Sequence, residues 1–529
     1  MMRKRLGLTA VVAAVSFFSG GWLMQGATAR PAPDGPRLLG EVLDHVTKYY
    51  VDSLSADSIY AKASHGLVEQ LGDPYSTLME REDFKQITEM TTGNYGGLGM
   101  QIDVREGWIT VVAPLPETPA ERAGIEAGDQ IVEVNGKVTR DLNQDDAVKT
   151  LRGAPGTRVD IKIRRPGIPQ PMPFALTRET IHYRSVQPGI LFDGGIGLIA
   201  LTPVIETSSD ELRAEVNALR AKGMKSLIFD LRGNPGGLLT EGITVSELFL
   251  DRGQGVVSTR GRVPEMNKSY AAQSTQPWPE MPVVVLVNEW SASAAEIIAG
   301  ALQDNDRAIV IGTATFGKGL VQTLFPIGND RALKLTTARW FTPSGRTIQR
   351  DAKNQEAQVE QATAEALGRD SVKRVLPTFK TVGGRTVKGG GGIVPDRIVR
   401  GDTLTDAEKT FAKALGSNVA AYRDALVSTA LEAKEKKLVT SEGFPVTDQM
   451  RQLVLSKLAA KGVVMSPEQI AGGRALLDDQ LAYEISRYVF GRQAEIRRRS
   501  SDDPQVRAAI ELLKRAPTRA ALMAKPAGE

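Results

Sequence analysis

The segment 283–323 constrains the fold more than any other part of this 529-residue chain. An unbroken apolar run at 283–287 predicts a buried strand. A turn of small residues follows, and the absence of glycine and proline from Ser293 until Gly300 predicts a helix that begins at Ser293. A strand, a tight turn with a serine and a helix expose the serine and direct backbone N–H groups at an oxyanion. We therefore expect an α/β core with a reactive serine at the start of a helix.

Two serines lie in this turn, and Ser293 is the candidate nucleophile. Ser291 is its rival, although a helix cap is a simpler role for Ser291. A small-residue helix packed against a sheet, without any catalytic role, is the third alternative that the local sequence leaves open.

The candidate base is a lysine, because a conventional triad needs an imidazole. The chain has only three histidines, His45, His65 and His182, and none lies in a catalytic motif. Lys318 follows Ser293 in the chain and has a glycine on each side. A free lysine amine has a pKa of about 10.4, so the amine must be desolvated to accept a proton at neutral pH.

The residues around Lys318 suit this requirement. Phe316, Leu320 and Val321 provide apolar walls, and the flanking glycines let the backbone approach closely. Gln322 lies four residues after the lysine, a separation that returns to the same face of a helix or a strand. We expect its amide to hold the lysine amine in line with the serine hydroxyl.

From about residue 166 the sequence alternates between strand and helix patterns. Leu212, Val216 and Leu219 form the apolar stripe of one helix. The predicted strands lie at 197–201, 226–231, 283–287 and 308–312. This alternation predicts an α/β sheet.

The block 95–165 resembles a PDZ domain. It begins Tyr-Gly-Gly-Leu-Gly-Met, and 119–125 and 128–136 look like the interior helix and the strand and turn of that fold. The resemblance implies a loop whose backbone N–H groups bind a peptide's terminal carboxylate while the peptide adds as a strand to the sheet edge. The loop residues are Gly97, Leu98, Gly99 and Met100. Arg152 either reports peptide occupancy to the domain that follows or is a surface arginine.

Motifs spread from about residue 72 to residue 396 resemble those of the C-terminal processing peptidases, also called tail-specific proteases. The motifs include Ser-Ala-Ser-Ala at 291–294, Ala-Leu-Gln-Asp at 301–304, Thr-Phe-Gly-Lys-Gly-x-Val-Gln at 315–322, a glycine-rich turn at 230–237, and the segments 342–346 and 392–396. The family often has a third serine where this chain has Ala295, a departure that leaves the assigned nucleophile intact.

The resemblance implies a role for each residue of the site. Ser293 would be the nucleophile, Lys318 the base and Gln322 its orienting partner. The oxyanion hole would use the amide of Ala294 and one amide from the turn at Gly236 and Gly237. No cofactor is required, and no metal site is expected.

The same resemblance implies an α/β core of the crotonase-like or Clp-protease-like type, with an inserted PDZ domain and helical N- and C-terminal regions. The expected domains are a signal peptide or membrane anchor at 1–29, a helical region at 36–94, the PDZ domain at 95–165, the peptidase core at 166–404 with a variable insertion at 351–391, and a helical region at 405–529.

The N-terminus has the pattern of an export signal. Arg3, Lys4 and Arg5 precede an apolar stretch at 6–24 and the sequence Ala-Thr-Ala that ends at Ala29. Cleavage after Ala29 and retention as a membrane anchor are the alternatives, because the stretch approaches the length of a membrane span. In both cases we expect the body of the protein outside the cytoplasm, as in a periplasm.

Both helical regions carry apolar stripes that need burial. The N-terminal stripe consists of Leu39, Val42, Val46 and Tyr50, and the C-terminal stripes consist of Met450, Leu453, Val454 and Leu458 and of Leu477, Leu481, Ile485 and Tyr488. For the C-terminal stripes, packing within the chain, docking onto the protease core and dimerisation are the alternatives.

Composition excludes other classes of function. A net charge of +4 with interspersed acids and bases argues against nucleic-acid binding. A chain with no cysteine and three histidines lacks the usual zinc ligands.

We interpret the chain as an exported serine endopeptidase that recognises protein substrates with apolar C-terminal tails, with a regulatory adaptor and a homodimer through the helical regions as further partnerships. One alternative is a PDZ-containing scaffold or adaptor with an inactive protease core, against which the intact Ser293, Lys318 and Gln322 argue. The other is acyl-CoA chemistry on a crotonase-like core, against which the export signal and the peptide-binding domain argue.

Overall fold

The computed structural model of the chain describes residues 35–165, 168–328, 330–350, 377–389 and 391–524. The expected signal segment lies outside these residues, as does most of the expected insertion. The chain divides into two compact units, one formed by residues up to 80 with 324–335 and the other by 81–323 with the residues from 336 onward. Among the described residues, no helix is both long enough and apolar enough to cross a membrane.

The first unit contains two helices and a strand pair. They are α2 (Gly35–Tyr49), α3 (Ala56–Glu69), β1 (Thr77–Met79) and the start of β18 (Arg331–Phe341). β1 runs antiparallel to β18 with Thr77 opposite Lys334. The sequence correctly predicts an amphipathic helix here, but α2 has no buried residue and Leu39 is 53% exposed. The N-terminal apolar stripe therefore lies open in this structure.

The core of the second unit is a six-stranded sheet in the order β10, β11, β12, β15, β16, β21. The strands are β10 (Ile190–Phe192), β11 (Ile196–Ala200), β12 (Ser226–Asp230), β15 (Val283–Val287), β16 (Ile309–Gly312) and β21 (Arg397–Ile398). β11 to β21 are parallel, and β10 is antiparallel to β11. The predicted strands are confirmed with ends that differ by about one residue.

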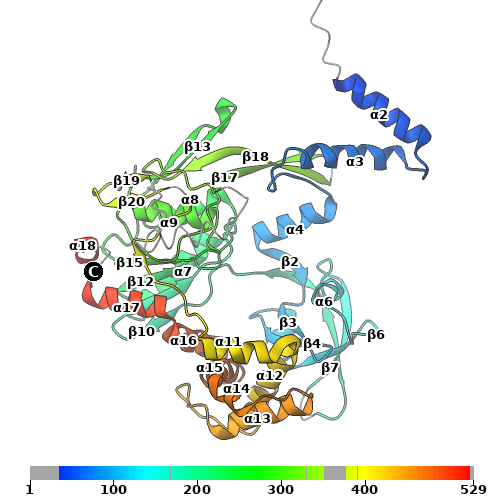
Figure 1. The fold of residues 1–529 in the computed structure, drawn as a ribbon, viewed down its shortest axis with the longest axis vertical. Coiled ribbons are helices and arrows are strands. Elements are labelled where there is room, and N and C mark those ends of the chain that lie inside the picture. Colours follow the sequence, from blue (N-terminus) through cyan, green and yellow to red (C-terminus); the bar gives the residue numbers. More distant parts are fainter. Residues whose placement is uncertain (1–34, 166–167, 329, 351–376, 390, 525–529) are drawn as a thin grey trace, which may run out of the picture. The chain divides into compact units, whose positions relative to one another are not determined.

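Helices cover both faces of this sheet (Figure 1). The helices of one face are α7 (Ser208–Ala221), α8 (Leu239–Glu247) and α9 (Ala294–Asp304), and those of the other are α17 (Pro504–Arg515) and α18 (Arg519–Ala524). Val283, Val285 and Val287 of β15 point into the first core, whereas Val284 and Leu286 point into the second. Burial on both faces explains why the strand reads as a continuous apolar run.

A second sheet packs against α9 and carries the residues that follow Lys318. It includes β13 (Gly255–Gly261), β14 (Lys268–Ala271), β17 (Leu320–Ile327) and the end of β18, with the helical turn η1 (Pro264–Met266) between β13 and β14. Trp340 of β18 is 1% exposed and joins the main core. A separate hairpin, β19 (Thr378–Lys380) and β20 (Thr386–Lys388), precedes β21.

The PDZ-like block forms its own sheet and its own apolar core. Its elements are β3 (Met100–Arg105), β4 (Trp108–Pro114), α5 (Pro119–Arg122), β5 (Gln130–Val134), β6 (Lys137–Val138), α6 (Gln144–Leu151), β7 (Arg158–Arg164) and β8 (Met172–Thr177). β8 follows residue 165, where the expected domain ends, and it pairs with β7 in antiparallel register. β2 (Asn94–Gly97), after α4 (Arg81–Thr92), pairs with β9 (Glu179–His182) and joins the two ends of the block.

The C-terminal helices up to residue 502 enclose a fourth apolar core. They are α11 (Asp406–Leu415), η2 (Gly416–Asn418), α12 (Val419–Glu435), α13 (Asp448–Ala460), α14 (Pro467–Gly472), α15 (Arg474–Ile485), η3 (Ser486–Phe490) and α16 (Arg492–Asp502). Most residues of the two C-terminal stripes, including Met450, Val454 and Leu481, are buried there. Packing within the chain therefore accounts for these stripes.

Candidate active site

Ser293 lies between β15 and α9 in a strained backbone conformation. Its φ is 54° and its ψ is −116°, a combination that L-residues rarely adopt and that is typical of a serine held at a sharp strand-to-helix turn. Its side chain is half-buried. A Cβ atom on Gly236 would lie 2.7 Å from the Cβ of Ser293, so only glycine fits at that position.

Ser291 has a structural role in the same turn. It is fully buried, and its Oγ donates to the carbonyl of Leu231 at 2.8 Å while accepting from the amide of Asn288 at 3.0 Å. The cap of α9 is Ser293 and not Ser291. Ser291 is therefore a poor nucleophile candidate, because its hydroxyl is buried and already bonded.

Glu296 joins the segment of Ser293 to the segment of Lys318. Its Oε2 accepts from the amide of Ser293 at 2.8 Å and from the amide of Lys318 at 2.9 Å. Its Oε1 accepts from the amide of Gly317 at 2.7 Å and from the hydroxyl of Thr315 at 2.5 Å. Because one oxygen binds both amides, the backbones of Ser293 and Lys318 lie side by side.

The carboxyl group of Glu296 is fully buried, and burial raises its pKa although all four hydrogen bonds act to lower it. Glu296 is not among the site residues predicted from the sequence. The signal was available, because a serine followed three residues later by glutamate at the start of a helix is typical of a capping box.

Arg350 fixes the loop before Lys318 from the other side. Its buried guanidinium donates to the carbonyls of Phe316 at 3.2 Å and Gly391 at 2.6 Å, and also to that of Thr315. Burial lowers the pKa of Arg350 to about 10, against the opposing effect of the Glu296 charge. Arg350 has no local sequence signal, because its partners are backbone carbonyls of distant segments.

Lys318 itself lies just before β17 with a half-buried side chain. Its carbonyl accepts from the indole Nε1 of Trp340 at 3.0 Å. Gly317 has a φ of 85°, and a Cβ atom there would lie 2.6 Å from the Cγ of Arg350. The glycine before the lysine is thus required by close packing.

Gln322 lies on β17, and its Nε2 donates to the Oγ1 of Thr336 on β18 at 3.3 Å. The side chain is half-buried. This hydrogen bond links the Gln322 side chain to the neighbouring strand.

The turn at 231–238 is attached to the serine turn by several hydrogen bonds. The amide of Ala292 donates to the carbonyl of Asn234 at 2.9 Å, and the side chain of Asn234 donates to the carbonyl of Leu201 at 2.7 Å. The amide of Gly236 donates to the Oδ1 of Asn234 at 2.8 Å. Since that amide is engaged, Gly237 is the better source of an oxyanion donor from this turn.

Gly237 and Ala294 occupy positions suited to that donation. Ala294 is the first residue of α9, where an amide has no partner within its helix. Gly237 has a φ of 151°, and a Cβ atom there would lie 1.8 Å from the carbonyl oxygen of Val204. No other residue fits at Gly237 without displacing the backbone.

The three histidines have other partners. His182 ends β9 and its Nε2 lies 2.8 Å from the Oε1 of Glu211. The Nε2 of His65 lies 3.1 Å from the Oε1 of Glu80, and the ring of His45 packs near that of Tyr49.

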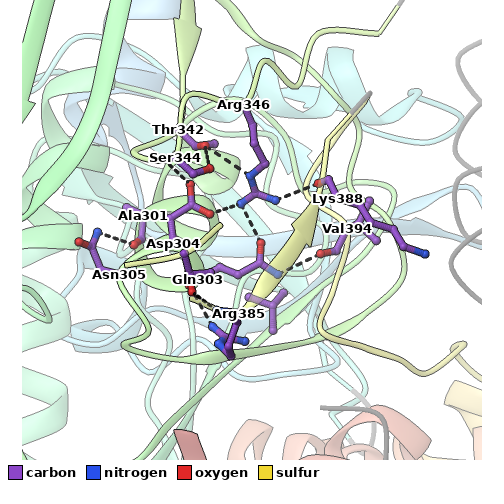
Figure 2. Close-up of polar contacts among 12 residues, drawn as sticks. Ala301, Gln303, Asp304, Asn305, Thr342, Ser344, Arg346, Arg385, Lys388 and Val394 are labelled. Atoms are coloured by element: carbon purple, nitrogen blue, oxygen red, sulfur yellow. Dashed lines mark hydrogen bonds and ion pairs between the residues drawn. The ribbon is translucent and has the colours of Figure 1, made fainter. Parts of the chain in front are cut away.

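The motifs at 342–346 and 392–396 hold the C-terminal end of α9 (Figure 2). Arg346 and Asp304 form an ion pair of 2.5 Å with both side chains fully buried. Arg346 also donates to the Oε1 of Gln303 at 2.9 Å, and Gln303 donates to the carbonyl of Val394 at 3.0 Å. Burial lowers the pKa of Arg346 although Asp304 opposes this effect. These motifs are structural supports for the helix that begins at Ser293.

The predicted peptide-binding loop lines a groove in the PDZ-like block. Gly97, Leu98, Gly99 and Met100 share this groove with residues of β3 and α6. The other lining residues are Tyr95, Ile102, Val148, Leu151 and Arg152. β3 is the edge strand of its sheet, so its outer side is open to another strand.

Arg152 is more than an isolated surface arginine. Its Nη1 binds the Oε2 of Glu89 on α4 at 3.0 Å, and its guanidinium lies 4.4 Å from the centre of the Tyr95 ring. It therefore connects the groove to the helix before the PDZ-like block.

Comparisons with known proteins agree with this architecture. The model of Peptidase family S41 matches residues 195–358, and the PDZ domain model matches residues 110–165. The carboxy-terminal-processing protease of Bartonella bacilliformis is 38% identical over 314 residues, which cover 59% of this chain and 71% of that protein. The carboxy-terminal processing protease CtpA of Bacillus subtilis is 36% identical over 344 residues, which cover 64% of this chain and 73% of that protein.

Among solved structures, the photosystem II D1 C-terminal processing protease is similar at 28% identity, with a TM-score of 0.34 and coverage of 60% of this chain and 85% of that one. The sequence matches define a serine-type peptidase with a PDZ domain. The chain belongs to peptidase family S41, among the carboxy-terminal processing proteases. The expected α/β fold class with a PDZ domain and helical regions is confirmed.

Proposed function

We propose that this peptidase acts outside the cytoplasm as an endopeptidase with a Ser293 and Lys318 catalytic pair, and that its PDZ domain binds the apolar C-terminal tails of protein substrates. The observation that carries the proposal is the shared contact with Glu296, whose Oε2 binds the amides of both Ser293 and Lys318. No metal or cofactor enters this mechanism.

In the proposed reaction, the Oγ of Ser293 attacks the peptide carbonyl carbon while the neutral amine of Lys318 takes the hydroxyl proton. The amides of Ala294 and Gly237 stabilise the oxyanion. Lys318 then returns the proton to the leaving amine, and the acyl-enzyme forms. A water molecule, deprotonated by Lys318, releases the new C-terminus and restores Ser293. Gln322, held by Thr336, orients the lysine amine.

The groove of the PDZ domain supports the proposed tail recognition. Backbone amides around Leu98 to Met100 would bind the terminal carboxylate while the tail pairs with β3. Met100, Ile102 and Leu151 make the groove apolar, which favours an apolar last residue. The N-terminal sequence supports export, and a regulatory adaptor and a homodimer stay predictions.

The test is cleavage of an unstructured protein with an apolar C-terminal tail by enzymes that lack residues 1–29. We expect Ser293→Ala and Lys318→Ala to lose activity by at least about 10³-fold while their unfolding temperatures stay near that of the parent enzyme. Equal cleavage by all three proteins would refute the Ser-Lys pair. Retained cleavage by Ser293→Ala together with a loss in Ser291→Ala would move the nucleophile to Ser291.

A further inference from the structure

Arg232 connects the oxyanion turn to a helix that is distant in the sequence. It lies at the start of the turn that carries Gly237, and its guanidinium binds Asp230 through Nε at 2.9 Å and Nη2 at 2.6 Å. Its Nη1 binds the Oδ2 of Asp503 at 2.5 Å and the Oε1 of Gln505 at 2.8 Å. Asp503 is 271 residues further along the chain. The side chain of Arg232 is 19% exposed, so solvent screens this cluster only in part.

Asp503 is held firmly because it begins α17. Its Oδ1 accepts from the amides of Gln505 at 2.8 Å and Val506 at 3.2 Å, which makes it the cap of this helix. Val506 is fully buried against the core sheet, and Gln505 also donates to the carbonyl of Val399 at 2.7 Å. The start of α17 is therefore a fixed point on the sheet.

The two carboxylate oxygens of Asp503 have separate tasks. Oδ1 caps α17, whereas Oδ2 binds Arg232. Capping alone would be satisfied equally well by asparagine or serine. Asp230 already neutralises the guanidinium charge, so a second carboxylate is not required for charge balance. Neither the capping of α17 nor the neutralisation of the Arg232 charge therefore explains the contact between Oδ2 and Arg232.

The purpose of this contact follows from the other bonds of the turn. The amide of Gly233 donates to the Oδ1 of Asn288 at 3.0 Å, and the hydroxyl of Ser291 donates to the carbonyl of Leu231. Residues on both sides of Arg232 are therefore bonded to the turn that carries Ser293. A shift of Arg232 would move the amide of Gly237 relative to Ser293.

We propose that Asp503 is a positioning residue that holds the oxyanion turn in place through Arg232. The reaction rate then depends on how helix α17 packs on the core sheet. The inference rests on the proposed function, because it assumes that the amide of Gly237 stabilises the oxyanion. Removal of an oxyanion donor costs about 10²-fold or more in rate, and a displaced donor should cost less.

The test uses Asp503→Asn in the enzyme that lacks residues 1–29, because asparagine keeps the cap and replaces only the Oδ2 acceptor by a donor. With a fluorogenic peptide that has an apolar C-terminus, we expect kcat to fall about tenfold, a fraction of the loss of a whole oxyanion donor, with KM unchanged. Affinity for a peptide boronate, which mimics the tetrahedral intermediate, should weaken by the same factor. Asp502→Asn, one position earlier and bonded to Tyr483, is the matched control and should leave kcat unchanged.

Rescue separates positioning from a structural effect. In Asp503→Asn with Gln505→Glu, a carboxylate returns beside the Nη1 of Arg232, and kcat should recover in part. Unchanged kcat in Asp503→Asn would overturn the inference, as would a loss of kcat that appears only together with a lower unfolding temperature and is not rescued. An inactive parent enzyme, or an active Ser293→Ala enzyme, would instead overturn the proposed function.

Discussion

At the residue scale, the site depends on a buried carboxylate that takes no part in the proposed bond making. In all four of its hydrogen bonds Glu296 is the acceptor, and the donors are three backbone amides and one hydroxyl. A glutamine at this position would present an amino group to some of these donors and leave them without an acceptor. We therefore expect the relative placement of Ser293 and Lys318 to be sensitive to a change of one atom in this side chain.

Glu296→Gln should lower kcat by about 10²-fold, because a displacement of about 1 Å in a catalytic group has an effect of that size. Steady-state kinetics on a fluorogenic peptide measure this change. Glu289→Gln is the control, because Glu289 lies exposed in the same turn and binds only the Thr313 hydroxyl among the contacts described. Equal kcat values for the two variants would contradict the role assigned to Glu296.

At the element scale, α16 is held to η3 by a carboxylate surrounded by arginines. Glu495 is 1% exposed and binds Arg487 at 2.7 Å, Arg492 at 2.6 Å and Arg499 at 2.8 Å. Burial acts to raise the pKa of Glu495, but the three arginines outweigh it and lower the pKa below the ordinary value. A group with a lowered folded pKa contributes stability above its unfolded pKa and loses that contribution as the pH falls through the folded value.

The C-terminal helices should therefore lose stability in acid. We expect Glu495→Gln to have a lower Tm than the parent at pH 7, and the difference should shrink as the pH falls below the ordinary glutamate pKa of 4.5. Thermal unfolding followed by circular dichroism from pH 7 to about pH 3 tests this sign. Glu511→Gln, which removes an exposed carboxylate from α17, serves as control. A difference that widens in acid would show that the sign is wrong.

At the scale of the whole molecule, the peptidase core and the PDZ groove are separate parts with separate chemistry. Val148 of α6 lines the groove and is half-buried, so a glutamate there would place a charge beside an apolar tail without disturbing the core of the domain. Binding of the tail and cleavage of the chain can thus be tested one at a time.

Val148→Glu in a Ser293→Ala background should raise the Kd for a labelled peptide with an apolar free C-terminus by at least about tenfold. The reasons are the loss of apolar burial and the repulsion between the new carboxylate and the terminal carboxylate of the peptide. Fluorescence anisotropy measures this Kd. Lys149→Glu, at the exposed neighbouring position, controls for the added charge. The Lys149→Glu protein should bind the same peptide less tightly when its C-terminus is amidated. Equal Kd values for the amidated and the free-acid peptide would refute recognition of the terminal carboxylate.

The sequence predicts those parts of the molecule in which local pattern decides the structure. The predicted strand at 283–287 has the same bounds as β15, and α9 begins directly after Ser293 as expected. Both predictions depend on local features, namely an apolar run and a segment without glycine or proline. Arg350 and Asp503 could not be predicted in the same way. Their partners are far along the chain, and only the folded topology brings them to the loops around Ser293 and Lys318.

The strand β8 illustrates the same limit. The apolar pattern of the PDZ domain is local, but the closing strand β8 is defined by its pairing with β7. The apolar stripe of α2 shows the opposite difference. The predicted helix forms, but within the described residues its stripe is not buried.

The shared contact with Glu296 also has a kinetic consequence. The amides of Ser293, Gly317 and Lys318 end on one side chain, so none of them can be released to solvent without loosening the grip on the others. Their hydrogen exchange should therefore proceed through one common opening event with a single rate. We therefore expect an opening at Lys318 to loosen Ser293 as well, so that the two candidate catalytic residues leave and regain their places together.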